Sequence, residues 1–368
     1  MLRADEDSTT KKKTKMKTTT LKADAAIGLS ALFVGSAAAQ DTSSVSDPVG
    51  YETLDLVTGF NYIGLRLHEA PVASGAVVSV AGAGETATIT FADGIADQLV
   101  DGQTFIVEVT SGDAIGATVI VDSFDVDADT VTVLADISGD LVAADSVTIR
   151  PSADLVSVFG DGEAVGLTSA PGFGDSDQVW VPDGSGGYAK YFYGEGGGFG
   201  AVEGWKDSEG NLIDDPTAVD LVYTDGIILF SQGDNSIVVS GSVKLTESSY
   251  VLTTQFNLLS SVYPVGATLV SLFGEDAVVS AGLVSAPGFG DSDQVWIPSA
   301  TGFDKYYYGQ GGGFGAIEGW KDSDGNNLDD PNTAEIETVD IPSGFFLVRN
   351  GDNDRQILGT QPLFYDSL

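Results

Sequence analysis

The segment PGFGDSDQVWV at residues 171–181 occurs a second time as PGFGDSDQVWI at residues 287–297, with 10 of 11 positions identical. A longer pair follows it, because residues 190–216 match residues 305–331 at 21 of 27 positions. The two offsets are nearly the same, 116 and 115 residues. The sequence therefore predicts two tandem copies of one unit, each of about 115 residues and large enough to be a domain.

The first copy contains extra sequence near its start. Gly59-Phe60-Asn61 resembles Gln255-Phe256-Asn257 at an offset of 196, whereas the next matched segments, which begin at Asp154 and Thr268, are 114 apart. The difference of 82 residues predicts a module inserted into the first copy. The predicted organisation is a leader over 1–39, a first repeat domain over 40–67 plus 150–237, the inserted module over 68–149, and a second repeat domain over 238–368.

Short runs rich in Val, Ile, Thr, Tyr and Phe, separated by Gly, Asn, Asp and Pro, dominate the chain after residue 40. Such runs are typical of β-strands joined by tight turns. Five of them fall within the predicted module, and only residues 153–159 and 267–273 suggest short helices. We therefore predict an all-β protein with two tandem, sandwich-like or barrel-like repeat domains and a small β-module inserted in the first.

The first forty residues have the pattern of a secretory signal peptide. A cluster of Lys residues between 11 and 17 precedes the apolar run Ala25–Gly35, which is followed by Ala37-Ala38-Ala39. A basic region, a short apolar region and small residues at the cleavage site define such signals. No later segment has the length and apolarity of a transmembrane helix. The sequence predicts export, with an extracellular, cell-surface or periplasmic location, and no membrane-spanning segment in the mature chain.

Composition excludes several classes of activity. The 368 residues include 54 Asp and Glu against 16 Lys and Arg, for a formal net charge of −38. A chain this acidic repels nucleic-acid backbones, so no nucleic-acid partner is expected. There is no Cys and the single His is His68, so thiol catalysis and multi-His metal sites within one chain are excluded. The same charge opposes compaction through self-repulsion, which salt or divalent cations would relieve.

An acidic turn occurs in each copy and suggests calcium. Ca²⁺ prefers six to eight oxygen ligands on a sharply folded chain. The spacing departs from EF-hand loops, because Gly210 and Gly325 stand fourth rather than sixth, so an ordinary solvated turn is the alternative interpretation. The candidate ligands are the oxygen-bearing side chains of the two turns: Asp207, Glu209, Asn211, Asp214 and Asp215, and Asp322, Asp324, Asn326, Asp329 and Asp330.

Aromatic residues repeat at matched positions in the two copies. They suit either core anchors or a sugar-binding platform, and the exposure of Trp205 and Trp320 distinguishes the two. Side chains alternate across a strand, so Tyr191 and Tyr193 are expected on one face and Phe192 on the other. The candidate sugar ligands are six aromatic side chains: Tyr191, Tyr193, Trp205, Tyr306, Tyr308 and Trp320.

Several of these segments together resemble a family of uncharacterised exported β-rich proteins from verrucomicrobial bacteria. The likeness rests on Ser46–Tyr51, the strand with Gly59-Phe60-Asn61, the repeated DQVW strand, the Tyr-rich strand and the Gly-Trp before each acidic turn. The resemblance implies a secreted β-rich protein. It carries no known activity, so it assigns no catalytic residue.

These features favour a secreted, non-enzymatic structural or self-assembling protein of the cell surface, such as a surface-layer or filament subunit stabilised by Ca²⁺. Its expected partners are copies of itself, and residues 41–56 are predicted to pair with a sheet edge of a neighbouring subunit. The alternative is an extracellular carbohydrate-binding protein with one aromatic site per repeat and a polysaccharide partner. A polysaccharide-cleaving enzyme is a third possibility, since carboxylate pairs are formed in space rather than in sequence.

Overall fold

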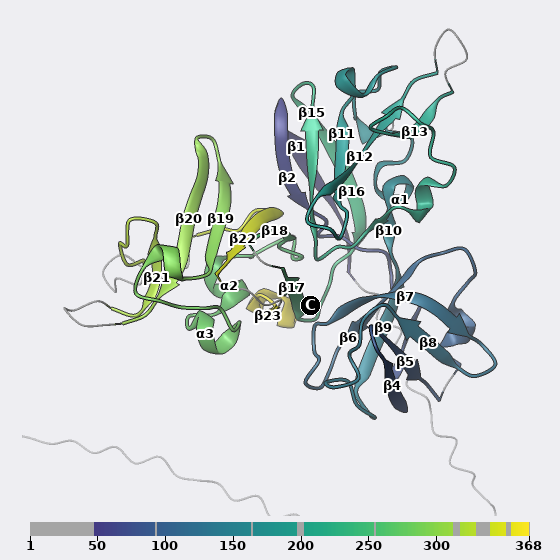
Figure 1. Ribbon diagram of the computed structural model, residues 1–368, viewed down its shortest axis with the longest axis horizontal. Helices are drawn as coiled ribbons and strands as arrows, with labels where there is room; N and C mark the ends of the chain where they lie inside the picture. The colour runs from purple at the N-terminus through teal and green to yellow at the C-terminus, as the bar shows by residue number, and fades with distance from the viewer. Residues whose placement is uncertain are drawn as a thin grey trace, which may run out of the picture. The chain divides into compact units, whose positions relative to one another are not determined.

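The computed structural model describes residues 48–92, 94–162, 165–196, 202–253, 255–311, 317–328, 339–350 and 355–367. Within the unit Ser46–Leu368, these residues form antiparallel β-sheets connected by turns and short helices (Figure 1). The prediction of an all-β fold is confirmed. None of the helices in the described ranges is long and apolar enough to cross a membrane.

The first repeat contains a five-stranded sheet in the order β13-β12-β11-β15-β2. The repeated DQVW segment forms its central strand, β11, flanked on both sides by antiparallel partners. The strands are β2 (Gly59–Gly64), β11 (Gln178–Pro182), β12 (Tyr188–Gly194), β13 (Gly204–Asp207) and β15 (Gly226–Ser231).

The second repeat contains a five-stranded sheet in the equivalent order, β21-β20-β19-β22-β18. Its central strand β19 carries the second DQVW segment, and Trp296 lies opposite Lys305 as Trp180 lies opposite Lys190. The strands are β18 (Gln255–Ser260), β19 (Gln294–Ser299), β20 (Gly302–Gly309), β21 (Gly319–Asp322) and β22 (Gly344–Arg349).

A two-stranded ribbon accompanies each of these sheets. β1 (Val49–Leu56) pairs with β16 (Asn235–Ser242), and β17 (Ser248–Leu252) pairs with β23 (Arg355–Gly359). The predicted domain boundary at residue 238 falls inside β16, so the first repeat extends to residue 242.

The β1 pairing gives residues 49–56 a partner within the chain that the sequence did not indicate. Val49–Leu56 forms a complete antiparallel ladder with β16 of the same chain, because these alternating apolar residues bury Leu54 and Leu56 in their own core. The ribbon has two strands, so the intrachain pairing occupies one edge of β1, and pairing of this segment with a neighbouring subunit stays a prediction. Residues 41–47 lie outside the described residues.

The inserted module is a single seven-stranded sheet in the order β3-β9-β6-β7-β8-β5-β4. Its end strands β3 and β4 are joined by only Val77 and Val78, so the sheet curls until its edges approach each other. All five predicted strands are present. The strands are β3 (Ala73–Ala76), β4 (Ser79–Ala83), β5 (Thr86–Thr90), β6 (Phe105–Val109), β7 (Thr118–Asp125), β8 (Thr130–Val133) and β9 (Ser146–Pro151).

The two predicted helices are each a little over one turn long. In α1 (Leu155–Phe159), the Asp154 side chain accepts hydrogen bonds from the first-turn amides, and Thr268 caps α2 (Leu269–Phe273) in the same way. The other short elements are α3 (Ala277–Ser280), the strand pair β10 (Ala153–Asp154) and β14 (Asp220–Leu221), and the 3₁₀ helices η1 (Ala96–Gln98), η3 (Phe173–Asp175), η4 (Pro216–Ala218), η5 (Phe289–Asp291) and η7 (Leu363–Ser367).

Strand β6 lies between two hydrophobic cores, and every residue in it is buried. Phe105, Val107 and Val109 point into the core of the module, whereas Ile106 belongs to the core shared by the two repeats. The alternation of side chains along a strand explains this division. The module is therefore packed against the repeats rather than tethered to them by its two connections alone.

The two repeats meet through close contacts at glycines. A Cβ at Gly344 would lie 2.6 Å from the Ile63 nitrogen, and one at Gly226 would lie 2.5 Å from the Leu258 side chain. These contacts correspond under the repeat offsets, since Gly226 matches Gly344 and Tyr62, next to Ile63, matches Leu258. Each repeat thus offers the same glycine to the same strand of the other, as in an isologous dimer interface.

We expect Gly344→Ala to destabilise the fold by about 1–3 kcal/mol, because its methyl group would overlap backbone that cannot move independently. Denaturant unfolding would measure the change. Gly233→Ala is the control, since a Cβ there meets nothing within 4 Å. Equal stabilities of the two variants would contradict close packing between the repeats.

Candidate functional site

The repeated DSD segment forms a buried hydrogen-bond network in each copy. Asp177 is 3% exposed, and its carboxylate accepts hydrogen bonds from the amides of Thr168 (2.8 Å) and Gln232 (2.7 Å) and from Asn235 Nδ2 (3.0 Å). Asp293 is 1% exposed and accepts from the amides of Val284 (2.7 Å) and Asn350 (2.8 Å). Each carboxylate therefore links the loop before the central strand, β11 or β19, to the residue that follows the adjacent strand, β15 or β22.

The Gln and Trp that follow continue this network. Gln178 Nε2 donates to the carbonyl of Phe173 (2.9 Å), and its Oε1 accepts from Trp180 Nε1 (2.9 Å). Gln294 and Trp296 make the equivalent bond at 2.8 Å. The identity of PGFGDSDQVW between the copies therefore has a structural explanation, since most of its polar groups position a turn and the central strand.

The predicted calcium ligands of the first turn are occupied by the turn itself. Asp207 Oδ1 accepts from the amides of Glu209 and Asn211, both at 2.9 Å, and its Oδ2 accepts from Asn211 Nδ2 at 2.9 Å. The hydrogen bonds from Asn211 lower the pKa of the Asp207 carboxyl. Asp215 instead caps η4 through the Thr217 amide, and Asp214 is exposed.

The second turn repeats this arrangement. Asp322 accepts from the amides of Asp324 and Asn326 and from Asn326 Nδ2, at 2.9, 2.9 and 2.7 Å. Asp329 and Asp330 lie outside the described residues. Across the ranges that the structure describes, no three His, Cys, Asp or Glu side chains are grouped to hold a metal ion, and calcium binding stays a prediction.

The predicted sugar-binding aromatics face the core. Trp205 and Trp320 are 3% and 0% exposed, and their indole nitrogens donate to the carbonyls of Gly160 and Gly274. Tyr191 and Tyr193 pack against the same core on one side of β12, while Phe192 lies on the other side, as predicted. The buried indoles argue against an open stacking platform, although Tyr193 and Trp205 border a pocket of about 590 Å³ together with Glu203, and sugar binding at these six residues stays a prediction.

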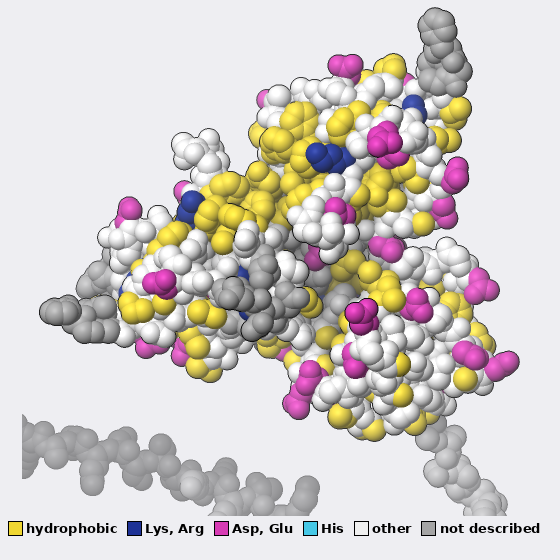
Figure 2. Space-filling model, in the orientation of Figure 1, with side chains coloured by type: hydrophobic (Ala, Val, Ile, Leu, Met, Phe, Trp, Pro, Cys, Tyr) yellow, Lys and Arg dark blue, Asp and Glu magenta, His cyan; other side chains and the backbone are white. Residues whose placement is uncertain are grey.

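A different set of aromatic residues, exposed or half-buried, lies on the outer side of the two five-stranded sheets. Figure 2 shows hydrophobic side chains gathered over β11 and β15 and over β19, β20 and β22, with Lys or Arg among them. Phe60 and Phe256 are 51% and 55% exposed. We call this surface the aromatic face and define it by Phe60, Tyr62, Trp180, Tyr188, Lys190 and Phe230 of the first repeat and Phe256, Trp296, Phe303, Lys305 and Phe346 of the second.

The rings of the aromatic face pack edge to face. Phe60 contacts Trp180 at an interplanar angle of 80°, and Phe256 contacts Trp296 at the same angle. A lysine ammonium lies 3.7 Å from the centroid of each indole ring, Lys190 over Trp180 and Lys305 over Trp296. The lysines cover the outer sides of these indoles through cation–π contacts.

A groove of about 700 Å³ lies where the aromatic face passes from one repeat to the other. Phe60, Tyr62 and Phe303 line it together with Asp55. A half-buried ion pair between Arg66 and Glu52 lies in the same groove. The Tyr62 ring contacts both Phe303 and Phe346 of the second repeat. Sequence reasoning missed this surface, although aromatic residues at alternate positions of one strand, such as Phe60 and Tyr62, could have indicated it.

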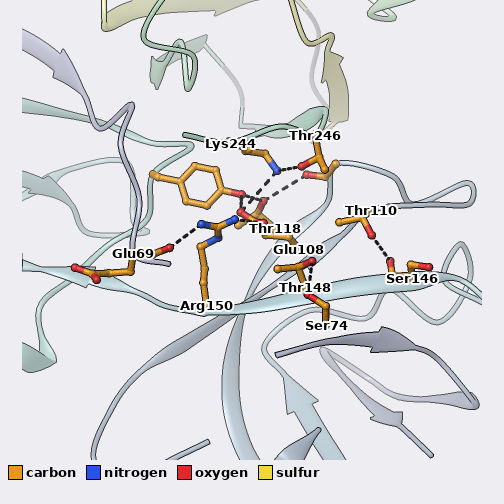
Figure 3. Close-up of polar contacts among 12 residues, drawn as sticks. Glu69, Ser74, Glu108, Thr110, Thr118, Ser146, Thr148, Arg150, Lys244 and Thr246 are labelled. Atoms are coloured by element: carbon orange, nitrogen blue, oxygen red, sulfur yellow. Dashed lines mark hydrogen bonds and ion pairs between the residues drawn. The ribbon is translucent and has the colours of Figure 1, made fainter. Parts of the chain in front are cut away.

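A buried charge cluster joins the inserted module to the repeats (Figure 3). Glu108 of β6 accepts a hydrogen bond from Arg150 at 2.9 Å, lies 3.6 Å from Lys244 Nζ and accepts a short hydrogen bond from Tyr223. Arg150 also donates to the carbonyl of Glu69. Two cations and one anion are thus buried together, and each is held by fixed hydrogen bonds.

The protonation of this cluster follows from burial and charge. Burial alone would raise the pKa of Glu108, but Lys244 and Arg150 outweigh it and bring the pKa to about 2. Burial lowers the pKa of His68, which packs against the Tyr223 ring, to about 3. The cluster is enclosed, so its ion pairs serve to fix the module in place rather than to meet a substrate.

Comparison with family models, curated proteins and solved structures gives no match for this chain. The function must therefore be argued from the aromatic face, the charge distribution and the sequence.

We expect Glu108→Gln to destabilise the protein by about 3–5 kcal/mol at pH 7, because it leaves the buried Lys244 and Arg150 without their anion. Thermal unfolding would measure it, with the exposed Glu85→Gln of the same module as the control. Since the folded-state pKa of Glu108 is depressed, its contribution is present above pH 4.5 and is lost as pH falls toward 2. A variant as stable as the control would contradict a role in holding the module.

Asp225 should have the opposite pH dependence. It lies where the repeats meet, bridged to Leu259, and burial raises its pKa to about 6. A raised carboxyl pKa means that its contribution is full below pH 3.8 and is lost as pH rises through 6. We expect Asp225→Asn to be more stable than the native chain by about 1–3 kcal/mol at pH 8 and equal to it at pH 4. Denaturant unfolding at both pH values would measure the difference, with the exposed Asp55→Asn as the control. If Asp225 were solvated, its variant would be as stable as the native chain at pH 8 as well as at pH 4.

Proposed function

We propose that this chain is a secreted, non-enzymatic structural protein that assembles with copies of itself outside the cell or at its surface. The observation that carries the proposal is the aromatic face. Exposed, contiguous apolar surface on a soluble chain marks an interaction site. In this chain, whose net charge is −38, the aromatic face stays apolar although charged residues are abundant elsewhere in the sequence.

The use of the repeated residues supports this proposal. Asp177, Asp293, Trp205 and Trp320 are buried and satisfied by partners in their own repeat. The matched side chains of the two copies are thus accounted for by packing and hydrogen bonding within each copy. Export is proposed from the basic, apolar and small-residue pattern of the first forty residues, which lie outside the described ranges.

Calcium is proposed as a stabiliser of assembly rather than as a catalytic ion. A surface with many carboxylates is self-repelling, and divalent cations or salt reduce that repulsion. Asp324 and Glu209 are exposed beside the satisfied Asp322 and Asp207, so bridging by Ca²⁺ would involve these outer carboxylates.

The second candidate is a carbohydrate-binding protein, favoured by the groove beside Phe60. Its aromatic rings and flanking polar side chains are the components of a sugar-binding cleft. This assignment moves the alternative site from Trp205 and Trp320 to Phe60, Tyr62 and Phe303.

Light scattering of the purified chain over protein concentration, with and without about 5–10 mM Ca²⁺ (above the roughly 0.1–1 mM dissociation constants of weak extracellular sites), tests the proposal. We expect particle size to grow with protein concentration and to grow further with Ca²⁺. A chain that stays monomeric under all conditions would contradict it. Retention on polysaccharide columns that is lost in Phe60→Ala would then favour the carbohydrate-binding alternative.

A further inference from the structure

The inserted module is strongly acidic, and Arg150 of its strand β9 is buried against Glu108. Residues 68–149 contain 14 Asp and Glu and no Lys or Arg. Most of these carboxylates are exposed, whereas Glu108 is buried and paired with Arg150. The module therefore concentrates negative charge on one part of the chain.

One end of the module combines this charge with apolar side chains. A shallow pocket of about 410 Å³ lies between the β7–β8 turn and the loop before β6. Val126 and Val100, in these two segments, are 46% and 56% exposed. We call this surface the acidic tip and define it by the pocket's lining residues: Leu99, Asp101, Phe124, Asp125, Val126 and Asp127.

The outer sides of the two five-stranded sheets have the opposite character. The pairing registers place no acidic residue at any outward-facing position of their strands, but they do place four lysines there: Lys190, Lys206, Lys305 and Lys321. Lys206 and Lys321 are buried, so the accessible ammonium groups are those over the two indoles, on Lys190 and Lys305. Acidic side chains lie at the margin, where Glu52, which is paired with Arg66, and Asp55 line the groove and Asp225 lies near Tyr188.

We propose that the acidic tip of one copy docks on the aromatic face of the next copy. This inference rests on the proposed self-assembly and names its two surfaces. Asp101 and Asp127 would meet Lys190 and Lys305, while Phe124 and Val126 would cover exposed rings. Charge complementarity selects this occupant, because two aromatic faces would bring lysines together and two acidic tips would bring carboxylates together.

The two surfaces belong to different parts of one chain, so the contact is heterologous. Each docked copy leaves a free acidic tip at one end and a free aromatic face at the other. Such contacts produce rings when the rotation closes and open filaments when it does not. The interaction is between exposed charges and is therefore weakened by salt.

Charge reversal tests the two surfaces separately. Lys190→Glu with Lys305→Glu makes one variant, and Asp101→Lys with Asp127→Lys makes the other. Each is expected to raise the protein concentration needed for assembly at least tenfold in sedimentation velocity. A 1:1 mixture should restore assembly, because the reversed face of the first variant then meets the reversed tip of the second.

The control is Glu85→Lys with Asp113→Lys, which makes the same charge change at exposed sites of the module outside the acidic tip. It should assemble as the native chain does, and thermal unfolding should show that all variants are folded. If both reversal variants assembled like the native chain, this inference alone would be overturned. The same would follow if the variants were folded but their mixture stayed monomeric. A native chain that never assembles would instead overturn the proposed function and this inference with it.

Discussion

The buried carboxylate before each central strand is the interaction on which the repeat depends. Asp177 and Asp293 each receive backbone amides from two separate segments, so one side chain fixes the entry to the sheet and the end of the adjacent strand together. Such a group is costly to leave unpaired. The near-identity of the DSDQVW segments between the copies follows from this requirement and does not need a shared catalytic role.

Close packing and buried charge then combine three parts into one unit. Close contacts at glycines pack the two repeats together, and the contacts of Glu108 with Lys244 and Tyr223 hold the module against them. Because these parts are fixed relative to one another, acidic and basic side chains lie on different surfaces of the chain. The module offers carboxylates, whereas the sheets present aromatic rings and lysines, and this asymmetry gives copies of the chain a preferred way to meet.

The sequence predicted much of this architecture, because strand composition, turn residues and the repeat offsets are local or countable. The all-β class, the strands of the module and the short helices at residues 155–159 and 269–273 are present. The sequence did not predict which aromatic side chains are buried and which are exposed. Trp205 and Phe60 are both aromatic residues in strands, and only the three-dimensional packing shows that the first is buried and the second exposed.

The partner of β1 within the chain was missed for a similar reason. Alternating apolar residues in β1 predict a strand but not its partner, which comes from residues about 185 positions later in the same chain. The acidic turns likewise have the composition of a metal site, while the hydrogen bonds of Asp207 and Asp322 to their own turns depend on the folded geometry.

Zero-length carbodiimide cross-linking of assembled protein, prepared from a mixture of isotopically light and heavy chains, tests the account most directly. It joins carboxylates to lysines only where they touch, and the mixed labels identify bonds between copies. The account predicts mixed-label links from Lys190 or Lys305 to Asp101, Asp125 or Asp127. Intermolecular links confined to other lysines, or assemblies in which Lys190 and Lys305 stay unlinked, would contradict it.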